Sequence, residues 1–592
     1  MLPRRRKYCP DDHCSLSKPL NHRKGKMESQ PGEPMNAASS SLQATQLGQL
    51  PQHSNELEQP SRLTDLPPEL LGQILEYLVP EHPELGDTRP VSYDKLLEGE
   101  TWFDITRKRR ALRALCLTSR GLYELVHPLV WRNIFILDEE GMVLLLRTFT
   151  ERPDIGTYGR FLSTHLTLSR DEVIRELKRA LTKYLPTFNP NMTMLKQDHP
   201  DIEASLRILA KVLHRMQIQS GEFDDVPQIM LYHLVCFLPK LDTVMLQVPV
   251  CDDHSEYTAL FERLRAQGSH NPPLHQVQNL LLQGDPELLM HFEQEECDCD
   301  IPELWGVQGR RHWSLFNSLP NIETVEISND DGVWNNIRHR RPDGSRPPYL
   351  TNVKHLFLHD SICTPRALHH ILTNAPDLKT LYMTPRRDEE QWLDPEAEGI
   401  DEHPESFDAA LRARPKQLTE LDVAWWDCAG MESLIGPEGC LASLPLLVNL
   451  DKLCVQLAVL YGTDPTTLMR PLVDMLPPNI TKLTLEEWWW EQLQDYDSMP
   501  HWTAGARALN YNLKQDYRAQ VLGVLAQFAS DCSDKMPKVR EVTFQTKFRW
   551  TWCLEGRATV ESHFEEVTRM FKRTGVAFNV DAEVEIASVS VP

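Results

Sequence analysis

The sequence predicts an α/β fold in which a small N-terminal all-α domain precedes a long solenoid of repeated helix–strand units. Two observations predict it. Two amphipathic helical segments lie near the N-terminus, and a six-residue apolar pattern recurs about nine times behind them. A chain of 592 residues is also too long for one ordinary core, which favours a small domain joined to a repeat array.

Residues 1–60 are rich in Ser, Pro, Gln, Asn and Gly and lack apolar periodicity, so we expect a disordered tail. Its first 26 residues are locally basic, which is compatible with a nuclear-import signal or with a solvated tail. Its possible zinc ligands match no closed four-ligand spacing, and we expect no metal at Cys9, His13, Cys14 or His22.

The first helical segment begins after this tail. Pro67 and Pro68 suit the first turn of a helix, where a missing N–H costs no hydrogen bond. Leu66 lies just outside, placed for a hydrophobic staple. The apolar residues that follow repeat at three and four and form one helical face: Leu70, Leu71, Ile74, Leu75 and Leu78.

A polar insert, residues 79–109, separates this helix from a second helical pattern that starts at Ala111. We expect Gly121 to mark a turn between two short helices and Pro128 to break the pattern before a first strand in "VWRNIFIL". The stripe of this second pattern is Leu112, Leu115, Cys116, Leu122 and Val126.

The recurring hexad has the form apolar-x-x-apolar-x-apolar, and its last four positions alternate as in a strand with one buried face. Several copies follow a helical stretch that ends in proline, which stops the helix and redirects the chain. The copies begin at Leu241, Val277, Ile322, Val353, Leu378, Leu418, Leu450, Ile480 and Val539, with a degenerate one at Leu162.

This helix–proline–strand unit predicts a leucine-rich-repeat-like solenoid over residues 136–592, with parallel strands on the concave face and helices on the convex face. The alternative is an α/β domain of unrelated βα units. Near the end, Gly575 takes a C-cap position before the strand-like "VAFNV", so we expect a closing cap. The apolar face of its helix is Val560, Phe564, Val567 and Phe571.

The segments "LxDLPPELLxxILxYL" and "LxxLCLTSRxLYxLxxPLVWRxI" together resemble an F-box, particularly those of filamentous fungi. The resemblance covers residues 63–135, within a domain that we place at 61–135. The insert at 79–109 is longer than the short loop usual in that family. The irregular repeats are similar to those that F-box proteins carry.

The resemblance implies a non-catalytic, substrate-recognition subunit of a Skp–cullin–F-box ubiquitin ligase. The F-box would bind a Skp-type adaptor and through it a cullin, and the solenoid would bind an unknown client protein. The alternative is an interaction scaffold that acts outside the ligase. The expected adaptor-binding residues are Leu66, Pro67, Leu70, Ile74, Leu75, Leu78, Cys116, Leu117 and Leu122.

Client contacts are expected on the concave face, where the second, third and fifth hexad residues and the residue after the hexad point outward. Phe357 and Tyr382 occupy such positions in consecutive copies, with His355 and His359 close by. Just past two strands lie tryptophans that are either a client-binding rim or packed beneath loops: Trp425, Trp426 and Trp488.

Other functions are disfavoured. A net charge of −23 disfavours nucleic acid, and no apolar run is long enough to cross a membrane, so we expect a soluble protein. No catalytic or nucleotide-binding motif occurs, so we expect no enzyme activity and no cofactor; an unrecognised active site is the remaining alternative. The 13 cysteines lack a disulfide framework, which favours the cytoplasm or the nucleus.

Overall fold

The chain forms two compact units, residues 1–62 and 63–592. The first unit, with the expected disordered tail, lies outside the described residues. The computed structural model describes residues 66–80, 100–136, 138–164, 179–180, 183, 226–248, 275–284, 319–328, 350–361, 363–385, 406–414, 416–423, 435, 440–462, 470–487, 504–547 and 562–583.

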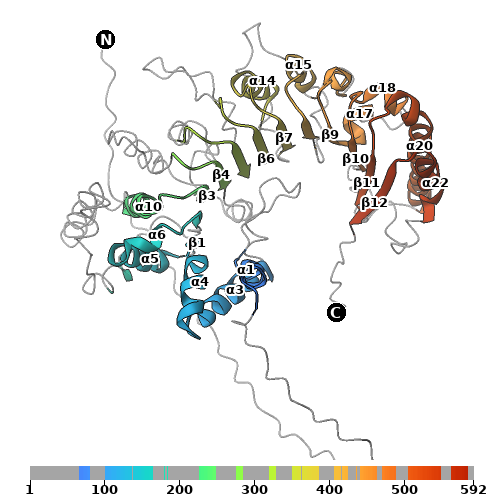
Figure 1. The fold of residues 1–592 in the computed structure, drawn as a ribbon. Helices are drawn as coiled ribbons and strands as arrows, with labels where there is room; N and C mark the ends of the chain where they lie inside the picture. The colour runs from blue at the N-terminus through green and yellow to red at the C-terminus, as the bar shows by residue number, and fades with distance from the viewer. Residues whose placement is uncertain are drawn as a thin grey trace, which may run out of the picture. The chain divides into compact units, whose positions relative to one another are not determined.

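Within these residues, twelve parallel strands form one sheet in which each strand pairs with the strands before and after it in the sequence (Figure 1). They are β1 (Asn133–Ile136), β2 (Phe161–Thr164), β3 (Thr243–Val248), β4 (Asn279–Gly284), β5 (Thr324–Ser328), β6 (His355–Ser361), β7 (Thr380–Pro385), β8 (Glu420–Val423), β9 (Lys452–Gln456), β10 (Lys482–Glu487), β11 (Glu541–Lys547) and β12 (Ala577–Glu583).

The predicted strands are confirmed. Each of the nine hexads overlaps one strand, from β3 to β11, and the degenerate copy overlaps β2. The segments "VWRNIFIL" and "VAFNV" contain β1 and β12. The chain is therefore a mixed α/β protein with a parallel, solenoid-like sheet, as the hexad pattern predicts.

Helices lie along one face of this sheet (Figure 1). One continuous apolar core between helices and strands extends from β1 to the last helix. The helices are α5 (Glu139–Glu151), α6 (Pro153–Gly156), α10 (Val226–Cys236), α14 (Pro365–Asn374), α15 (Phe407–Arg412), α17 (Leu457–Tyr461), α18 (Leu472–Met475), α20 (Ala504–Lys535) and α22 (Glu565–Thr574), with the 3-10 helix η7 (Leu444–Leu446). We call the opposite face of the sheet the inner face.

The entry to each strand repeats the same main-chain geometry. The N–H groups of Lys354 and His355, the second and third residues of their hexad, both donate to the carbonyl of Glu323, at 2.7 and 3.0 Å. Glu323 is the second residue of the preceding hexad. The same paired bonds recur along the sheet, so the register of each strand is set by the previous repeat.

Asparagines reinforce this register from the turn before the hexad. Asn352 Nδ2 donates to the carbonyl of Pro320 at 2.5 Å. Equivalent side-chain bonds to the preceding repeat recur at Asn321, Asn449 and Asn479. Such a bond satisfies a turn carbonyl that the sheet itself leaves without a partner.

The N-terminal helices are α1 (Pro68–Tyr77), α3 (Glu100–Cys116) and α4 (Arg120–Val130), here called the helical trio. Helix α3 begins at Glu100, well before the predicted start at Ala111. Asp104 forms ion pairs with Arg107 and Lys108 at 2.7 and 3.1 Å, which stabilise the first turns of this polar helix.

Two predictions about α4 are wrong. The turn before it does not lie at Gly121, because the Ser119 hydroxyl accepts from the N–H of Leu122 at 3.2 Å and caps the helix two residues before Gly121. Pro128 does not break the pattern but lies inside α4. Its missing N–H leaves only the carbonyl of the exposed residue Glu124 without a helical partner.

A junction joins the trio to the first strand. Arg132 Nη1 lies 2.6 Å from Glu76 Oε2 of α1, and Asn133 Nδ2 donates to the carbonyl of Pro80 at 2.6 Å. Trp131 follows α4 and places its ring 6.1 Å from that of Phe149 in the solenoid core. The trio and β1 are thus connected by polar and aromatic contacts.

The C-terminal end has the predicted helix and cap. Phe564, Val567 and Phe571 are buried, and the Phe571 ring stacks on that of Phe578 in β12 at 4.8 Å. Gly575 has a φ of 78° and ends α22 in the left-handed conformation, so its predicted role is confirmed. Val560 lies outside the described residues.

Candidate protein-binding surfaces

Helix α1 has two apolar faces. Leu71 and Leu75 are buried, whereas Leu70 and Ile74 are 48% and 41% exposed. Tyr77, one turn further, is 72% exposed. A stripe at positions i, i+4 and i+7 on a helix forms one continuous surface, so among the described residues α1 presents an exposed apolar stripe. At its end, Lys108 Nζ of α3 lies 5.3 Å from the centroid of the Tyr77 ring.

The buried face of α1 belongs to a small core of its own, made of Leu71, Leu75, Leu112, Leu122 and Val126. Of the expected adaptor-binding residues, Leu75 and Leu122 lie in this core. Leu66, Leu78 and Cys116 pack against it and are partly buried. Pro67, Leu70, Ile74 and Leu117 are exposed.

The trio exposes further apolar side chains that the sequence analysis did not single out. Tyr77 continues the stripe on α1, and Tyr123 and Leu125 on α4 are 39% and 54% exposed. Leu117, one of the expected adaptor-binding residues, lies between α3 and α4 and is 88% exposed. The spacing of Tyr77 from Ile74 and Leu70 was the one signal that could have found it.

The inner face of the sheet carries the second candidate surface. Phe357 of β6 and Tyr382 of β7 are register partners, and their rings lie 6.3 Å apart. His359 lies 4.7 Å from the Tyr382 ring, and its Nε2 lies 3.4 Å from Glu326 Oε1 on β5. These side chains form one connected group across β5, β6 and β7.

Phe357 and Tyr382 are both buried, 6% and 4% exposed. Neither side chain is accessible in this structure, and their expected role as client contacts stays a prediction. Trp425, Trp426 and Trp488 lie outside the described residues. Whether they form a client-binding rim or pack beneath loops therefore stays a prediction.

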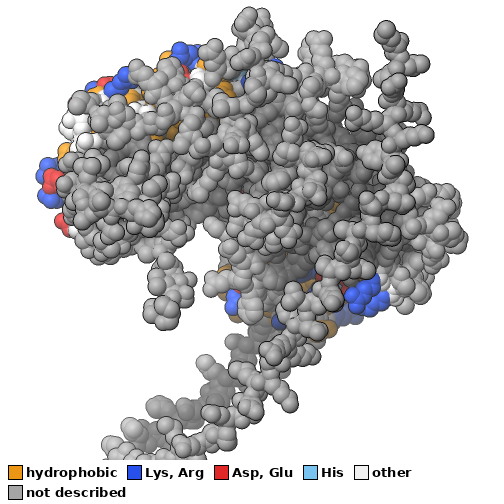
Figure 2. Space-filling view, turned by 180° about the vertical axis from the view of Figure 1, so that it is seen from behind, with side chains coloured by type: hydrophobic (Ala, Val, Ile, Leu, Met, Phe, Trp, Pro, Cys, Tyr) orange, Lys and Arg blue, Asp and Glu red, His pale blue; other side chains and the backbone are white. Residues whose placement is uncertain are grey.

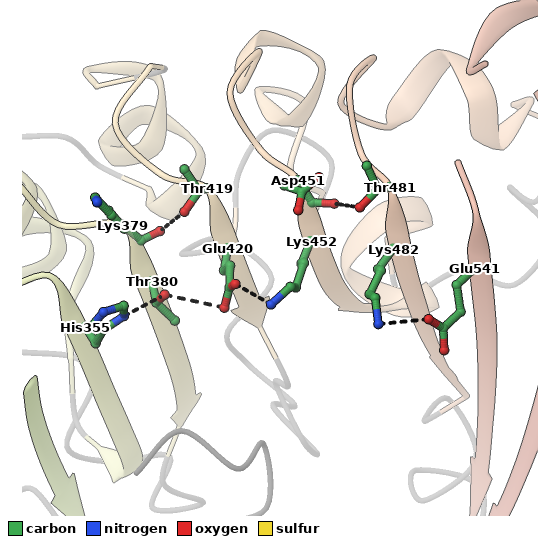
Figure 3. Close-up of polar contacts among 10 residues, drawn as sticks. All are labelled: His355, Lys379, Thr380, Thr419, Glu420, Asp451, Lys452, Thr481, Lys482 and Glu541. Atoms are coloured by element: carbon green, nitrogen blue, oxygen red, sulfur yellow. Dashed lines mark hydrogen bonds and ion pairs between the residues drawn. The ribbon is translucent and has the colours of Figure 1, made fainter. Parts of the chain in front are cut away.

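A polar strip crosses the strand entries of the inner face (Figure 3). His355 Nδ1 lies 3.0 Å from Thr380 Oγ1, which donates to Glu420 at 3.4 Å. Glu420 in turn pairs with Lys452. Burial lowers the pKa of His355, so this imidazole is held neutral within the strip.

The strip continues to the C-terminal strands. Lys482 of β10 pairs with Glu541 of β11 at 2.9 Å, and this contact raises the pKa of Lys482 (Figure 3). The Thr481 hydroxyl reaches the carbonyl of Asp451 one repeat earlier. Acidic and basic groups thus alternate along an accessible strip and neutralise one another locally.

Deeper on the inner face lies a buried acidic group on β8, β9 and β10. Burial and the nearby charge of Glu486 raise the pKa of Asp422 well above its usual range. Cys454, between them, donates its thiol to Glu486 at 3.5 Å, and burial raises its pKa as well. Both amide atoms of the Gln456 side chain, which is 1% exposed, lack a hydrogen-bond partner among the described residues.

This group does not form a metal site. Across the described ranges, no three His, Cys, Asp or Glu side chains are grouped so as to hold a metal ion. The six cysteines that the structure describes form no disulfide with one another. No helix in this part of the chain is long and apolar enough to cross a membrane.

The described outer surface carries charges of both signs. Figure 2 shows Lys and Arg side chains beside Asp and Glu side chains at the end of the molecule that carries α20 and α22. Arg569 and Glu566 of α22, for example, form an ion pair at 2.7 Å. Such a mixed surface favours solubility over attraction of a polyanion.

No protein-family model matches the sequence, and a search of curated proteins finds no similar sequence.

Proposed function

We propose that this protein is the substrate-recognition subunit of a Skp–cullin–F-box ubiquitin ligase. The helical trio acts as an F-box that binds a Skp-type adaptor, and the sheet is a leucine-rich-repeat-like solenoid that binds a client protein. The observation that carries the proposal is the exposed apolar stripe of Leu70 and Ile74, placed directly above a buried trio core.

The stripe has the energetics of a docking surface. Burying one Leu or Ile side chain contributes roughly 1.5–3 kcal/mol, so covering Leu70 and Ile74 together supplies a substantial part of a stable interface. Leu71 and Leu75, on the other face of α1, hold the helix in place before any partner binds. The trio therefore supports an interface that is formed in advance, which lowers the entropic cost of binding.

The proposed activity requires no bond chemistry from this chain. A receptor that holds a client near the ubiquitin-carrying enzyme raises the local concentration of client lysines. The described cysteines form no disulfide with one another, which is compatible with the reducing cytoplasm or nucleus in which such ligases act.

The test is capture of a purified Skp-type adaptor by the full chain. We expect the double substitution Leu70→Glu and Ile74→Glu to abolish capture, because two charges would have to be buried against the adaptor. The matched control is Leu144→Glu on α5, where a leucine of the solenoid is 37% exposed. Circular dichroism reports whether either variant unfolds.

Adaptor capture that survives in a folded Leu70→Glu, Ile74→Glu variant would contradict the ligase proposal. Copurification of a cullin with the adaptor-bound chain separates a ligase subunit from the alternative, a scaffold outside the ligase. A chain that binds the adaptor but never recruits a cullin is such a scaffold.

A further inference from the structure

A polar groove of about 660 Å³ follows the edge of the sheet at which β2 to β7 begin. Each repeat from β2 to β7 contributes at least one residue, from the turn or the first hexad positions before its strand. The groove is therefore built by the repeat itself and not by a single loop.

One end of the groove is basic. Arg160, before β2, and Lys240, before β3, are both exposed and form no ion pair with residues that the structure describes. The Arg160 guanidinium donates to the carbonyl of Lys240 at 3.4 Å, which holds the two cations at the same end. Asp242 offsets one of these charges and accepts from the Thr243 hydroxyl at 2.9 Å.

The middle of the groove is lined by amides. Asn321 and Asn352 donate their Nδ2 groups to the preceding repeat, which leaves their Oδ1 atoms as oriented acceptors. Gln276 and Gln278 are exposed, and their side chains have no hydrogen-bond partner in the described chain. Such groups suit the N–H and C=O groups of a peptide main chain.

The other end is acidic. Glu323 and Lys354 form an ion pair at 2.8 Å and neutralise each other. Beyond them Asp377, before β7, is exposed and forms no ion pair with described residues. The groove thus has a net positive charge at the β2–β3 end and a net negative charge at the β7 end.

Strand spacing gives the length of the groove. Neighbouring strands lie about 4.8 Å apart, so four to five steps from the basic end to Asp377 span roughly 19–24 Å. An extended chain rises about 3.3–3.4 Å per residue, and about six or seven residues cover this span.

We propose that this groove binds an extended segment of the client protein, with an acidic side chain at Arg160 and Lys240 and a basic side chain about six or seven residues away at Asp377. The inference rests on the proposed function, because it takes the solenoid to be the client-binding part. The mixed charge of the lining matches a charged peptide and repels a polyanion at the Asp377 end.

The experiment uses phage-displayed random twelve-residue peptides, selected on the full chain at low salt. We expect the enriched peptides to carry an acidic and a basic residue about six or seven positions apart. A synthetic consensus peptide should bind the double variant Arg160→Glu, Lys240→Glu roughly tenfold more weakly by fluorescence anisotropy. Exchanging the acidic residue of the peptide for lysine should restore its binding to that variant.

The matched control is Lys538→Glu, Arg540→Glu. These residues precede β11 and lie outside the groove, and Arg540 donates to the carbonyl of Pro537 much as Arg160 donates to Lys240. The control variant should bind the consensus peptide as the unmodified chain does. Equal loss in both variants would mean non-specific charge attraction and would overturn the inference.

The inference is also overturned if no peptide is enriched, or if the enriched peptides lack the paired charges. These outcomes leave the adaptor interface untouched, since none of the groove residues belongs to the helical trio. Loss of adaptor binding would in turn leave a groove that still selects the peptide. The two proposals therefore fail separately.

Discussion

The main chain of Gly156 packs directly against the carbonyl group of Phe237, with no room for a Cβ atom between them. This contact holds α6 against the turn that follows α10, so two distant segments of the chain meet main chain to main chain. Only glycine permits such an approach.

Gly156→Ala should therefore lower the free energy of unfolding by about 1–3 kcal/mol, because main chain and not a flexible side chain must move. The check is denaturant unfolding followed by circular dichroism. Gly72→Ala on α1 is the control, since its Cβ would meet nothing within 4 Å and alanine favours a helix. Equal loss in both variants would show that the contact at Gly156 is not the cause.

Asp422→Asn should stabilise the protein at neutral pH. The raised pKa means that the folded state keeps the proton of Asp422 at pH values where the unfolded state, with a pKa near 3.8, has released it. Asp422 therefore opposes folding increasingly as pH rises above about 4. Unfolding at pH 4 and pH 7 should show the gain only at pH 7; destabilisation at pH 7 would mean that Asp422 is ionised and paired.

His233 should make the solenoid sensitive to acid. Burial lowers its pKa from 6.5 to about 4. The free energy of unfolding therefore includes a contribution from neutral His233 that is fully present above pH 6.5. It is lost as pH falls toward 4, because the unfolded state binds the proton first. The loss is on the order of 3 kcal/mol. His233→Gln should flatten this part of the stability profile, and an unchanged slope would exclude His233 as the source.

Gly575→Ala should destabilise the C-terminal end. Its φ of 78° places the residue in the left-handed region, which costs an alanine roughly 1–2 kcal/mol. Gly523, inside α20 with open space around it, is the matched position where alanine should stabilise. Thermal unfolding of the two variants should shift in opposite directions, and a shared direction would contradict the helix-cap argument.

The strands were predictable from sequence because alternation has a period of two and parallel strands repeat one register. In the hexad from Val353, Leu356 and Leu358 enter the core while Phe357 faces away, as the pattern requires. The early start of α3 was not predictable, since its first turns are stabilised by ion pairs around Asp104 and not by an apolar stripe.

The candidate sites were predictable only in part. Adjacent leucines such as Leu70 and Leu71 both fit the helical pattern, and only packing against α3 and α4 decides which of them is exposed. The polar groove escaped prediction because it combines single residues from six repeats. Asn321 and Asn352 each look like ordinary turn residues until the repeats are placed side by side.

The junction at Glu76, Pro80, Arg132 and Asn133 ties α1 to the first strand at two points. A hinge needs a connection that can bend, and these two polar contacts resist bending. The trio and the first repeats would then move together. Under the proposed function, an adaptor bound to the trio would therefore fix the direction in which a bound client points. Weakening the junction, for example by Arg132→Ala, would change which client lysines are reached and leave both binding affinities intact.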